Sequence, residues 1–303
     1  MKKPDLLRIT SILILLLLAG TSIAQEAAHY FEQGKSKVKA GDLQGAIQDF
    51  TRCIELKPDF ADAYLGRGDA RFDVNDFKNA IADFSKVLEL APTTQQAYLL
   101  RGLAKYNMED LEGAIKDYNE VIKLNADFEV AFYNRGLAKM DLADFDGAIA
   151  DYSKAIELQP QWAQPYYHRA RCLEQGSGKK EAINDYSKAI ELEPEFIEAY
   201  LQRGLTLAYE FGKRTEGLAD LNKVIELAPD YFAGYFYRGT LTFTQSDFDK
   251  AIELEPGFAE AYHMRGLGKV MLSDKKGGCD DLLMAVKLGS EDAIDSVKKN
   301  KCK

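Results

Sequence analysis

The chain has 303 residues, of which 46% are hydrophobic and 29% are charged, with 39 Lys and Arg against 48 Asp and Glu. The formal net charge of −9 disfavours binding to nucleic acid or to anionic lipid surfaces, because both would repel an acidic protein. The length alone would suggest about two globular domains, but that estimate fails for a chain built from repeats.

Residues 1–24 differ from the rest of the chain. A basic start precedes an almost wholly apolar run from Ile9 to Ala19, and the stretch from Ser22 to Ala24 carries the small residues that a signal peptidase needs. We therefore predict a signal peptide cleaved after Ala24, and an exported protein that is periplasmic or associated with the cell envelope. A retained membrane anchor is the alternative, although the apolar run is shorter than the ~20 residues that span a bilayer.

The remainder of the chain repeats a short phrase, Tyr-x-x-Arg-Gly, at a fixed stride. Two clear copies run from Tyr64 to Gly68 and from Tyr98 to Gly102, which places them 34 residues apart. Self-similarity at this period predicts a stack of small units, each of which contacts only its neighbours. Added length therefore means added repeats rather than added globular domains.

A second phrase follows the first by about a dozen residues, as in Asp144 to Tyr152. Apolar residues at three- and four-residue spacings in both phrases predict two amphipathic helices joined by a short turn. Proline ends the second helix because it lacks an amide hydrogen and its ring obstructs the preceding turn. The prolines in this position are Pro58, Pro92, Pro160, Pro194, Pro229 and Pro256.

Small residues recur where the two helices of a repeat should cross, for example Gly136, Ala148 and Ala155 in the fourth repeat. A glycine inside a helix costs about 1 kcal/mol relative to alanine. Its return at every stride predicts a close approach between the helices that a larger side chain would prevent.

These positions resemble the tetratricopeptide repeat family, whose pattern of aromatic, glycine, alanine and proline residues they match. The resemblance implies an all-α, right-handed α-solenoid of about eight helix hairpins, in which the first helices line a concave groove and the second helices face outward. The chain's Gly-Cys-Asp and Lys-Cys endings also look like those of exported members from Bacteroidetes-type bacteria. The predicted domains are a signal peptide at 1–24, a repeat array at 25–290, and a capping helix and tail at 291–303. The repeats are 27–60, 61–94, 95–128, 129–162, 163–196, 197–231, 232–258 (shortened) and 259–290.

Two repeats depart from the 34-residue length. The sixth has one extra residue, which we expect the turn from Gly212 to Glu216 to absorb. The seventh lacks seven residues, and we expect its second helix to be shorter by about 10 Å but not rotated. From this shortening we hypothesise a thin seam near 245–256, where the array bends or opens.

The resemblance also implies the residues of the groove. They form an apolar, aromatic-rich strip of a kind that commonly binds an extended or helical peptide. Packing between repeats is the alternative role for the same side chains. The strip consists of Leu65, Leu99, Leu103, Tyr106, Tyr133, Leu137, Met140, Tyr167, Leu201, Leu205, Tyr209 and Phe236, with Asp62, Asp69, Asp73, Asp141, Arg171 and His168 as polar neighbours.

Charged residues recur in step with the repeat. Arginines precede the small residue of most first helices, a glycine except for Ala170 in the fifth repeat, and aspartates recur in the second helices, so we expect a ladder of ion pairs between helices. An anion-binding arginine stripe is the alternative. The arginines are Arg67, Arg101, Arg135, Arg169, Arg203, Arg238 and Arg265, and the aspartates are Asp49, Asp83, Asp117, Asp151, Asp185 and Asp220.

The four cysteines fall into two classes. Cys53 and Cys172 occupy helix positions where a buried thiol is the ordinary expectation. Cys279 and Cys302 lie near the outer ends of a predicted antiparallel helix pair with its turn at Gly289. An oxidising compartment would let them form a disulfide, and closing this loop could add ~3 kcal/mol.

Patterns typical of catalysis are absent from the sequence. The three histidines are scattered, and no His-Glu-x-x-His or nucleophile-elbow serine occurs. The segment from Gly176 to Lys180 only partly resembles a phosphate loop, since Leu173 stands where the first glycine should be. We therefore predict a non-enzymatic protein with no cofactor and no metal site.

The predicted function is an exported scaffold that binds a protein or peptide segment in its concave groove, in envelope assembly or secretion. No nucleic acid partner is expected, and no membrane insertion after signal cleavage. The alternative is an accessory subunit of an envelope enzyme or transport complex, which binds through its convex face.

Overall fold

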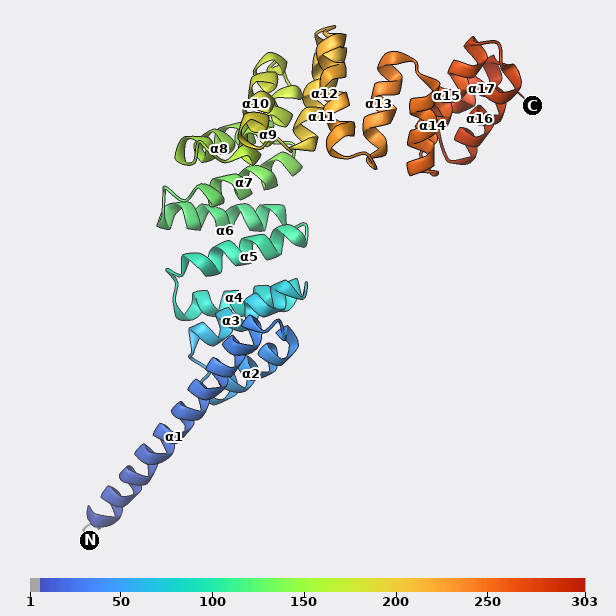
Figure 1. Cartoon of the computed structure of the whole chain (residues 1–303). Coiled ribbons are helices and arrows are strands. Elements are labelled where there is room, and N and C mark those ends of the chain that lie inside the picture. The colour runs from blue at the N-terminus through green and yellow to red at the C-terminus, as the bar shows by residue number, and fades with distance from the viewer. Residues whose placement is uncertain (1–5, 303) are drawn as a thin grey trace. The chain divides into compact units, whose positions relative to one another are not determined.

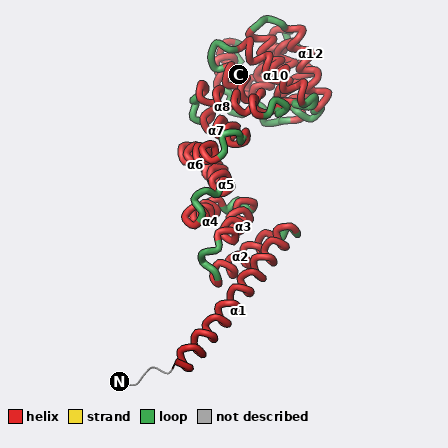
Figure 2. Tube along the Cα trace, turned by 90° about the vertical axis from the view of Figure 1, so that its left-hand side faces the viewer, coloured by secondary structure: helices red, strands yellow, loops and turns green. Residues whose placement is uncertain are grey.

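The computed structural model describes residues 6–302, with side chains from Ile23 onward. Residues 6–302 fold into seventeen α-helices and one short π-helix, with no strand (Figure 2). The predicted all-α class is therefore confirmed. The expected signal segment at 1–24 lies largely outside the described side chains, and its backbone from Leu6 belongs to the first helix.

Successive helices pair as antiparallel hairpins along the chain (Figure 1). The first helices of the hairpins are α1 (Leu6–Lys39), α3 (Ala61–Asp73), α5 (Gln95–Asn107), α7 (Glu129–Asp141), α9 (Ala163–Glu174), α11 (Ile197–Leu205) with the π-helix η1 (Thr206–Glu210), α13 (Phe232–Thr242) and α15 (Ala259–Met271). The second helices are α2 (Leu43–Leu56), α4 (Phe77–Leu90), α6 (Leu111–Leu124), α8 (Phe145–Leu158), α10 (Lys179–Leu192), α12 (Arg214–Leu227), α14 (Gln245–Leu254) and α16 (Lys275–Lys287), and α17 (Glu291–Lys299) follows. The chain divides after Gln159 into an N-terminal unit containing α1–α8 and a C-terminal unit containing α9–α17.

The regular hairpin turn has a fixed construction, seen in the fourth repeat. Ala143 adopts a left-handed conformation with φ of 59°, and the amide of Asp144 donates to the carbonyl of Lys139 at 2.8 Å. The carboxylate of Asp144 then accepts a hydrogen bond from the amide of Gly147 at 3.0 Å, which caps α8. Asp42, Asp110 and Asp274 cap their helices in the same way.

The recurring glycine makes room for an aromatic ring of the second helix. A Cβ atom placed on Gly136 would lie 2.7 Å from Cε1 of Tyr152, which is fully buried. Gly68 and Gly102 face Phe84 and Tyr118 in the same manner. The predicted close approach is confirmed. A packed ring lies against the glycine in these repeats, whereas Gly204 and Gly266 lie against the backbone carbonyls of Gly217 and Gly278.

Most of the recurring arginines join three groups, as Arg135 shows. Its Nε and Nη2 donate to Asp151 of α8 at 2.9 and 2.5 Å, and its Nη1 donates to Asn119 of α6. Its guanidinium also lies 5.4 Å from the ring centroid of Phe132, one helical turn earlier. The arginine therefore ties a hairpin together and ties it to the preceding second helix.

The predicted ladder of ion pairs is confirmed. The pairs are Arg67–Asp83, Arg101–Asp117, Arg135–Asp151, Arg169–Asp185, Arg203–Asp220, Arg238–Asp247 and Arg265–Asp281. Because these aspartates are buried, breaking a pair should cost more than the ~0–1 kcal/mol expected of exposed pairs. The paired guanidinium groups argue against a stripe that binds external anions.

In several repeats a second cation reaches the same aspartate from one turn further along the first helix. Lys139 lies 2.7 Å from Asp151 and also donates to the carbonyl of Gly147. The equivalent second cations are Arg71, Lys105 and Lys269. In the first repeat, where Gln33 stands at the arginine position, Lys37 pairs with Asp49. In the fifth, sixth and seventh repeats the position is occupied instead by Leu173, Leu207 and Thr242.

The sixth repeat corrects one expectation from the sequence. The linker between η1 and α12 comprises residues 211–213, which matches the three residues 108–110 between α5 and α6. The extra residue is instead accommodated within the first helix, where Thr206–Glu210 forms the π-helix η1. A π-turn holds one more residue than an α-turn, so the insertion leaves the loop length unchanged.

The seventh repeat corrects a second expectation. The seven missing residues are removed from three places rather than from the second helix alone. Compared with the fourth repeat, the first helix has 11 residues instead of 13, the second has 10 instead of 14, and the linker has two residues instead of three. The short linker places Phe243 at φ 59° with 63% of its surface exposed. Arg238 still pairs with Asp247, so the ladder continues through the shortened hairpin.

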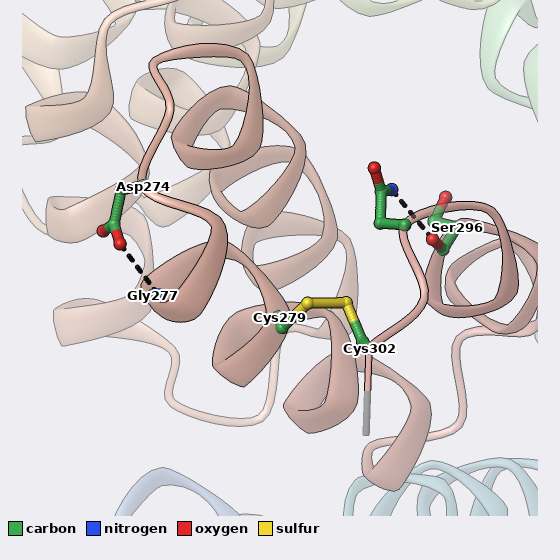
Figure 3. The surroundings of a disulfide bond; sticks show 6 residues. Asp274, Gly277, Cys279, Ser296 and Cys302 are labelled. Carbon is green, nitrogen blue, oxygen red and sulfur yellow. Dashed lines mark hydrogen bonds between the residues drawn. A yellow bond between two sulfur atoms is a disulfide. The ribbon is translucent and has the colours of Figure 1, made fainter.

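The last helix is linked covalently to the last hairpin (Figure 3). Cys279 in α16 and Cys302 after α17 form a disulfide with a Cα–Cα distance of 5.2 Å, as the sequence predicts. Ala293 of α17 is buried, while His263 of α15 contacts the hydroxyl of Ser296 at 2.8 Å. These contacts place α17 against the end of the final hairpin, where a cap is needed.

Candidate binding faces

The N-terminal unit carries a row of large apolar side chains on its first helices. We call this row the N-terminal strip, and it consists of Leu65, Leu99, Leu103, Tyr106, Tyr133, Leu137 and Met140. All seven side chains are only partly buried, although α3 lies against α5 and α5 against α7. Partly exposed apolar side chains on successive helices form a surface that a partner segment can cover.

Polar contacts within the strip hold neighbouring first helices together. The hydroxyl of Tyr106 in α5 donates to Asp141 of α7 at 2.5 Å. Burial, followed by this bond to Asp141, raises the pKa of Tyr106 well above its ordinary value. Burial also raises the pKa of Tyr133 to about 12. Burial therefore favours the neutral form of both phenols further.

The charges beside the strip are acidic. Asp62 and Asp69 share the helix face of Leu65, since they are three and four residues from it, and Asp73 follows at the end of α3. Burial, then the charge of Asp73, raises the pKa of Asp69. The cations of α3, α5 and α7 are paired with the second-helix aspartates. They are Arg67, Arg71, Arg101, Lys105, Arg135 and Lys139.

In the C-terminal unit the expected groove residues separate into two groups. Tyr167, Leu201 and Phe236 are buried and belong to apolar clusters formed with adjacent helices. These three side chains serve packing, which was the alternative role. Leu205 is partly buried, and Tyr209 is 56% exposed.

Leu205 and Tyr209 line a small cavity of about 220 Å³ between α9 and η1. Glu174 and Thr206 lie in the same lining, and the hydroxyl of Thr206 donates to the Glu174 carboxylate. Glu174 also accepts a hydrogen bond from the buried Tyr186 hydroxyl at 2.6 Å. Glu174 occupies the same repeat position as Tyr106 and Met140, so the repeat pattern marks it as the place where a carboxylate interrupts the apolar row.

Burial shifts the pKa values of one histidine and of both free cysteines. Burial lowers the pKa of His263. Burial raises the pKa of the Cys172 thiol to about 11 and also raises that of Cys53, so both thiols are poorly reactive. Across the residues that the structure describes, no group of three or more His, Cys, Asp or Glu is gathered as a metal site would require. No helix in the described part of the chain combines the length and apolar character needed to cross a membrane.

Family comparisons agree with this architecture. Three sequence profiles described as tetratricopeptide repeat or TPR repeat match residues 31–94 and 68–127, 130–161 and 180–209. The matched segments together cover more than half of the chain, so the protein belongs to the tetratricopeptide repeat family. A comparison with curated proteins gave no significant match.

Solved structures with the same fold cover different shares of the chain. A tetratricopeptide repeat protein from Parabacteroides merdae ATCC 43184 covers 92% of this chain and 100% of its own, at 18% identity and a TM-score of 0.59. The MamA protein covers 57% of this chain and 95% of its own, at 26% identity and a TM-score of 0.54. YrrB, described as a TPR protein with an unusual peptide-binding site, covers 61% of this chain and 95% of its own, at 24% identity and a TM-score of 0.53.

Proposed function

We propose that the protein is an exported, non-enzymatic scaffold that binds a peptide or protein segment on the face of its first helices. The observation that carries this proposal is the N-terminal strip, in which seven large apolar side chains on α3, α5 and α7 stay partly exposed. A folded chain gains by burying such surface, at about 25 cal/mol per Å², and a bound partner would supply that burial. YrrB offers a peptide-binding precedent on a similar fold.

The charges suggest which segments would bind. The carboxylates of Asp62, Asp69 and Asp73 lie on or beside the strip, and the neighbouring cations are paired within the hairpins. A partner segment that combines apolar side chains with basic ones would complement this face.

Export to the cell envelope is the second part of the proposal. The Cys279–Cys302 disulfide supports it, because such bonds persist in oxidising compartments and are rare in the cytosol. Fractionation of cells that produce the tagged protein, followed by amino-terminal sequencing, tests it. We expect the mature chain to begin at Gln25 and to be found outside the cytosol. An intact amino terminus on a cytosolic protein would contradict export.

Crosslinking in the envelope fraction tests the binding face. Leu137→Asp places a charge in the strip, and Leu124→Asp makes the same change on α6, at a leucine that is 41% exposed. With melting temperatures matched, we expect Leu137→Asp to lose the crosslinked partner and Leu124→Asp to keep it. Loss with Leu124→Asp alone would favour the alternative, an accessory subunit that binds through its second helices.

A further inference from the structure

A larger cavity, of about 520 Å³, lies in the C-terminal unit between α10, the α11–η1 junction and α12. We call it the α10–α12 cavity. It shares no lining residue with the small cavity of Leu205 and Tyr209, and most of its lining comes from second helices. Its volume falls within the range of ordinary ligand pockets, which is enough for one or two side chains of a partner.

The cavity forms where the sixth repeat departs from the regular pattern. In the fourth repeat Lys139 extends toward Asp151 and the carbonyl of Gly147. In the sixth repeat Leu207 stands four residues after Arg203, which is the place of that lysine, and its side chain lines the cavity. The π-turn η1 includes Leu207, and Phe211, directly after it, lies at the opening.

Four apolar side chains line the cavity, namely Ile183 of α10, the buried Leu207, Phe211 and Ala219 of α12. Phe211 remains 41% exposed. An apolar group in the cavity would cover mainly the exposed part of Phe211, since Leu207 is already buried, and the gain would scale with the area removed from water.

The back wall of the cavity is electrically balanced. Arg203 donates to Asp220 at 2.8 and 2.7 Å and to the hydroxyl of Ser187 at 3.0 Å. Because the pair compensates itself, the wall does not select the charge of an occupant.

The rim of the cavity is net basic. Lys180 and Lys213 lie there, and Glu216 lies 3.2 Å from Lys213. Lys213 is the residue before α12, where Asp110 and Asp144 stand before α6 and α8. With Lys213 in place of an aspartate, the charge just before α12 is positive rather than negative. The N-terminus of a helix also favours anions, so both features act in the same direction.

We propose that the α10–α12 cavity is a second docking site, distinct from the first-helix face, for a partner segment that presents an apolar side chain beside a carboxylate. The apolar side chain packs against Leu207 and Phe211, and the carboxylate meets Lys180 and Lys213. The overall negative charge of the protein does not oppose this contact strongly, because charges beyond about 8 Å are screened at physiological salt.

Binding of two matched synthetic peptides to the mature full chain tests the proposal. Both are acetylated and amidated, and they differ only in their central residues, Glu-Leu-Leu-Glu in one and Lys-Leu-Leu-Lys in the other. Titration calorimetry should detect the acidic peptide and give at least about tenfold weaker binding for the basic one. Equal binding of the two peptides, or failure of the acidic peptide to bind, would overturn the proposal.

Three variants locate the site. Lys213→Asp restores the aspartate of regular repeats, and Ala219→Phe fills the cavity from its α12 wall. Each should weaken binding of the acidic peptide by about tenfold. The control Lys223→Asp changes charge equally on α12 outside the lining and should leave affinity within about twofold.

Two further measurements distinguish docking in the cavity from binding at the N-terminal strip and from binding of a small amphiphile. Leu137→Asp, which disrupts the N-terminal strip, should leave binding of the acidic peptide unchanged, so the two faces are tested independently. Unchanged affinity in Ala219→Phe would reject the cavity. Displacement of the peptide by decanoate at equal affinity would show that the site takes a free amphiphilic acid, which also contradicts docking of a protein segment.

Discussion

The fourth and sixth repeats share one framework and differ in what surrounds it. Both keep the glycine, the arginine and the buried aspartate, with the charged pair joined at 2.5 to 2.9 Å. The fourth adds Lys139 beside the aspartate and Asp144 as a helix cap, whereas the sixth has Leu207 and Lys213. The shared groups hold the hairpin together, and the replaced groups border the α10–α12 cavity. Positions that vary around a fixed framework are therefore where this chain opens a cavity.

Replacing the buried aspartates should give the largest loss in the free energy of unfolding, and the loss should be greater in the fourth repeat than in the sixth. Asp151→Ala leaves both Arg135 and Lys139 without their carboxylate, so we expect a loss of about 4 kcal/mol. Asp220→Ala leaves only Arg203 without its partner and should cost about 3 kcal/mol. Guanidinium unfolding of both variants measures this. Equal losses would mean that the second cation contributes little to the regular repeat.

The disulfide should give a comparable effect confined to the C-terminal unit. Its cysteines are 23 residues apart, and opening a loop of this size costs about 3 kcal/mol in the chain-entropy description. Cys302→Ser should therefore increase amide exchange in α16 and α17 and leave α3–α8 unchanged. Exchange that rises equally in both units would contradict a local role. Thiol counting on the unfolded wild-type protein without reductant should find two thiols, from Cys53 and Cys172.

The smallest expected effects on stability concern Tyr118 and Tyr186, which stand at the same position in the third and fifth repeats. Removing the two hydroxyls should have effects of opposite sign. The Tyr118 hydroxyl is buried, and no hydrogen bond to it occurs among the described residues. The Tyr186 hydroxyl instead donates to Glu174 at 2.6 Å. Tyr118→Phe should raise stability by about 1 kcal/mol, because it removes an unsatisfied polar group, and Tyr186→Phe should lower it by about 1–2 kcal/mol. Thermal melting of both variants checks this, and a loss in Tyr118→Phe would point to a bound water.

The repeated features could be predicted from the sequence because each copy is supported by the others. The glycine opposite Tyr152 and the pairing of Arg135 with Asp151 follow from spacing that recurs along the chain. The disulfide was predictable because the helix pair brings Cys279 and Cys302 to the same end.

The irregular features were less accessible from the sequence. An extra residue fits a loop or a π-turn equally well in a linear pattern, and only packing around Thr206–Glu210 decides between them. Likewise, Leu201 and Leu205 occupy the same helix face, but the neighbouring helices bury Leu201 and leave Leu205 at the edge of a cavity. The α10–α12 cavity was not predicted, although Leu207 in a lysine position and Lys213 in a capping position were visible signals.

The disulfide at Cys302 affects where local unfolding of the array begins. Arrays of this kind open most easily at their termini, because a terminal repeat has only one neighbour. The bond between α16 and the residues after α17 hinders fraying at that terminus. Proteolytic nicking under native conditions should therefore begin elsewhere in the C-terminal unit, with the exposed two-residue link at Phe243 and Thr244 as the weakest point.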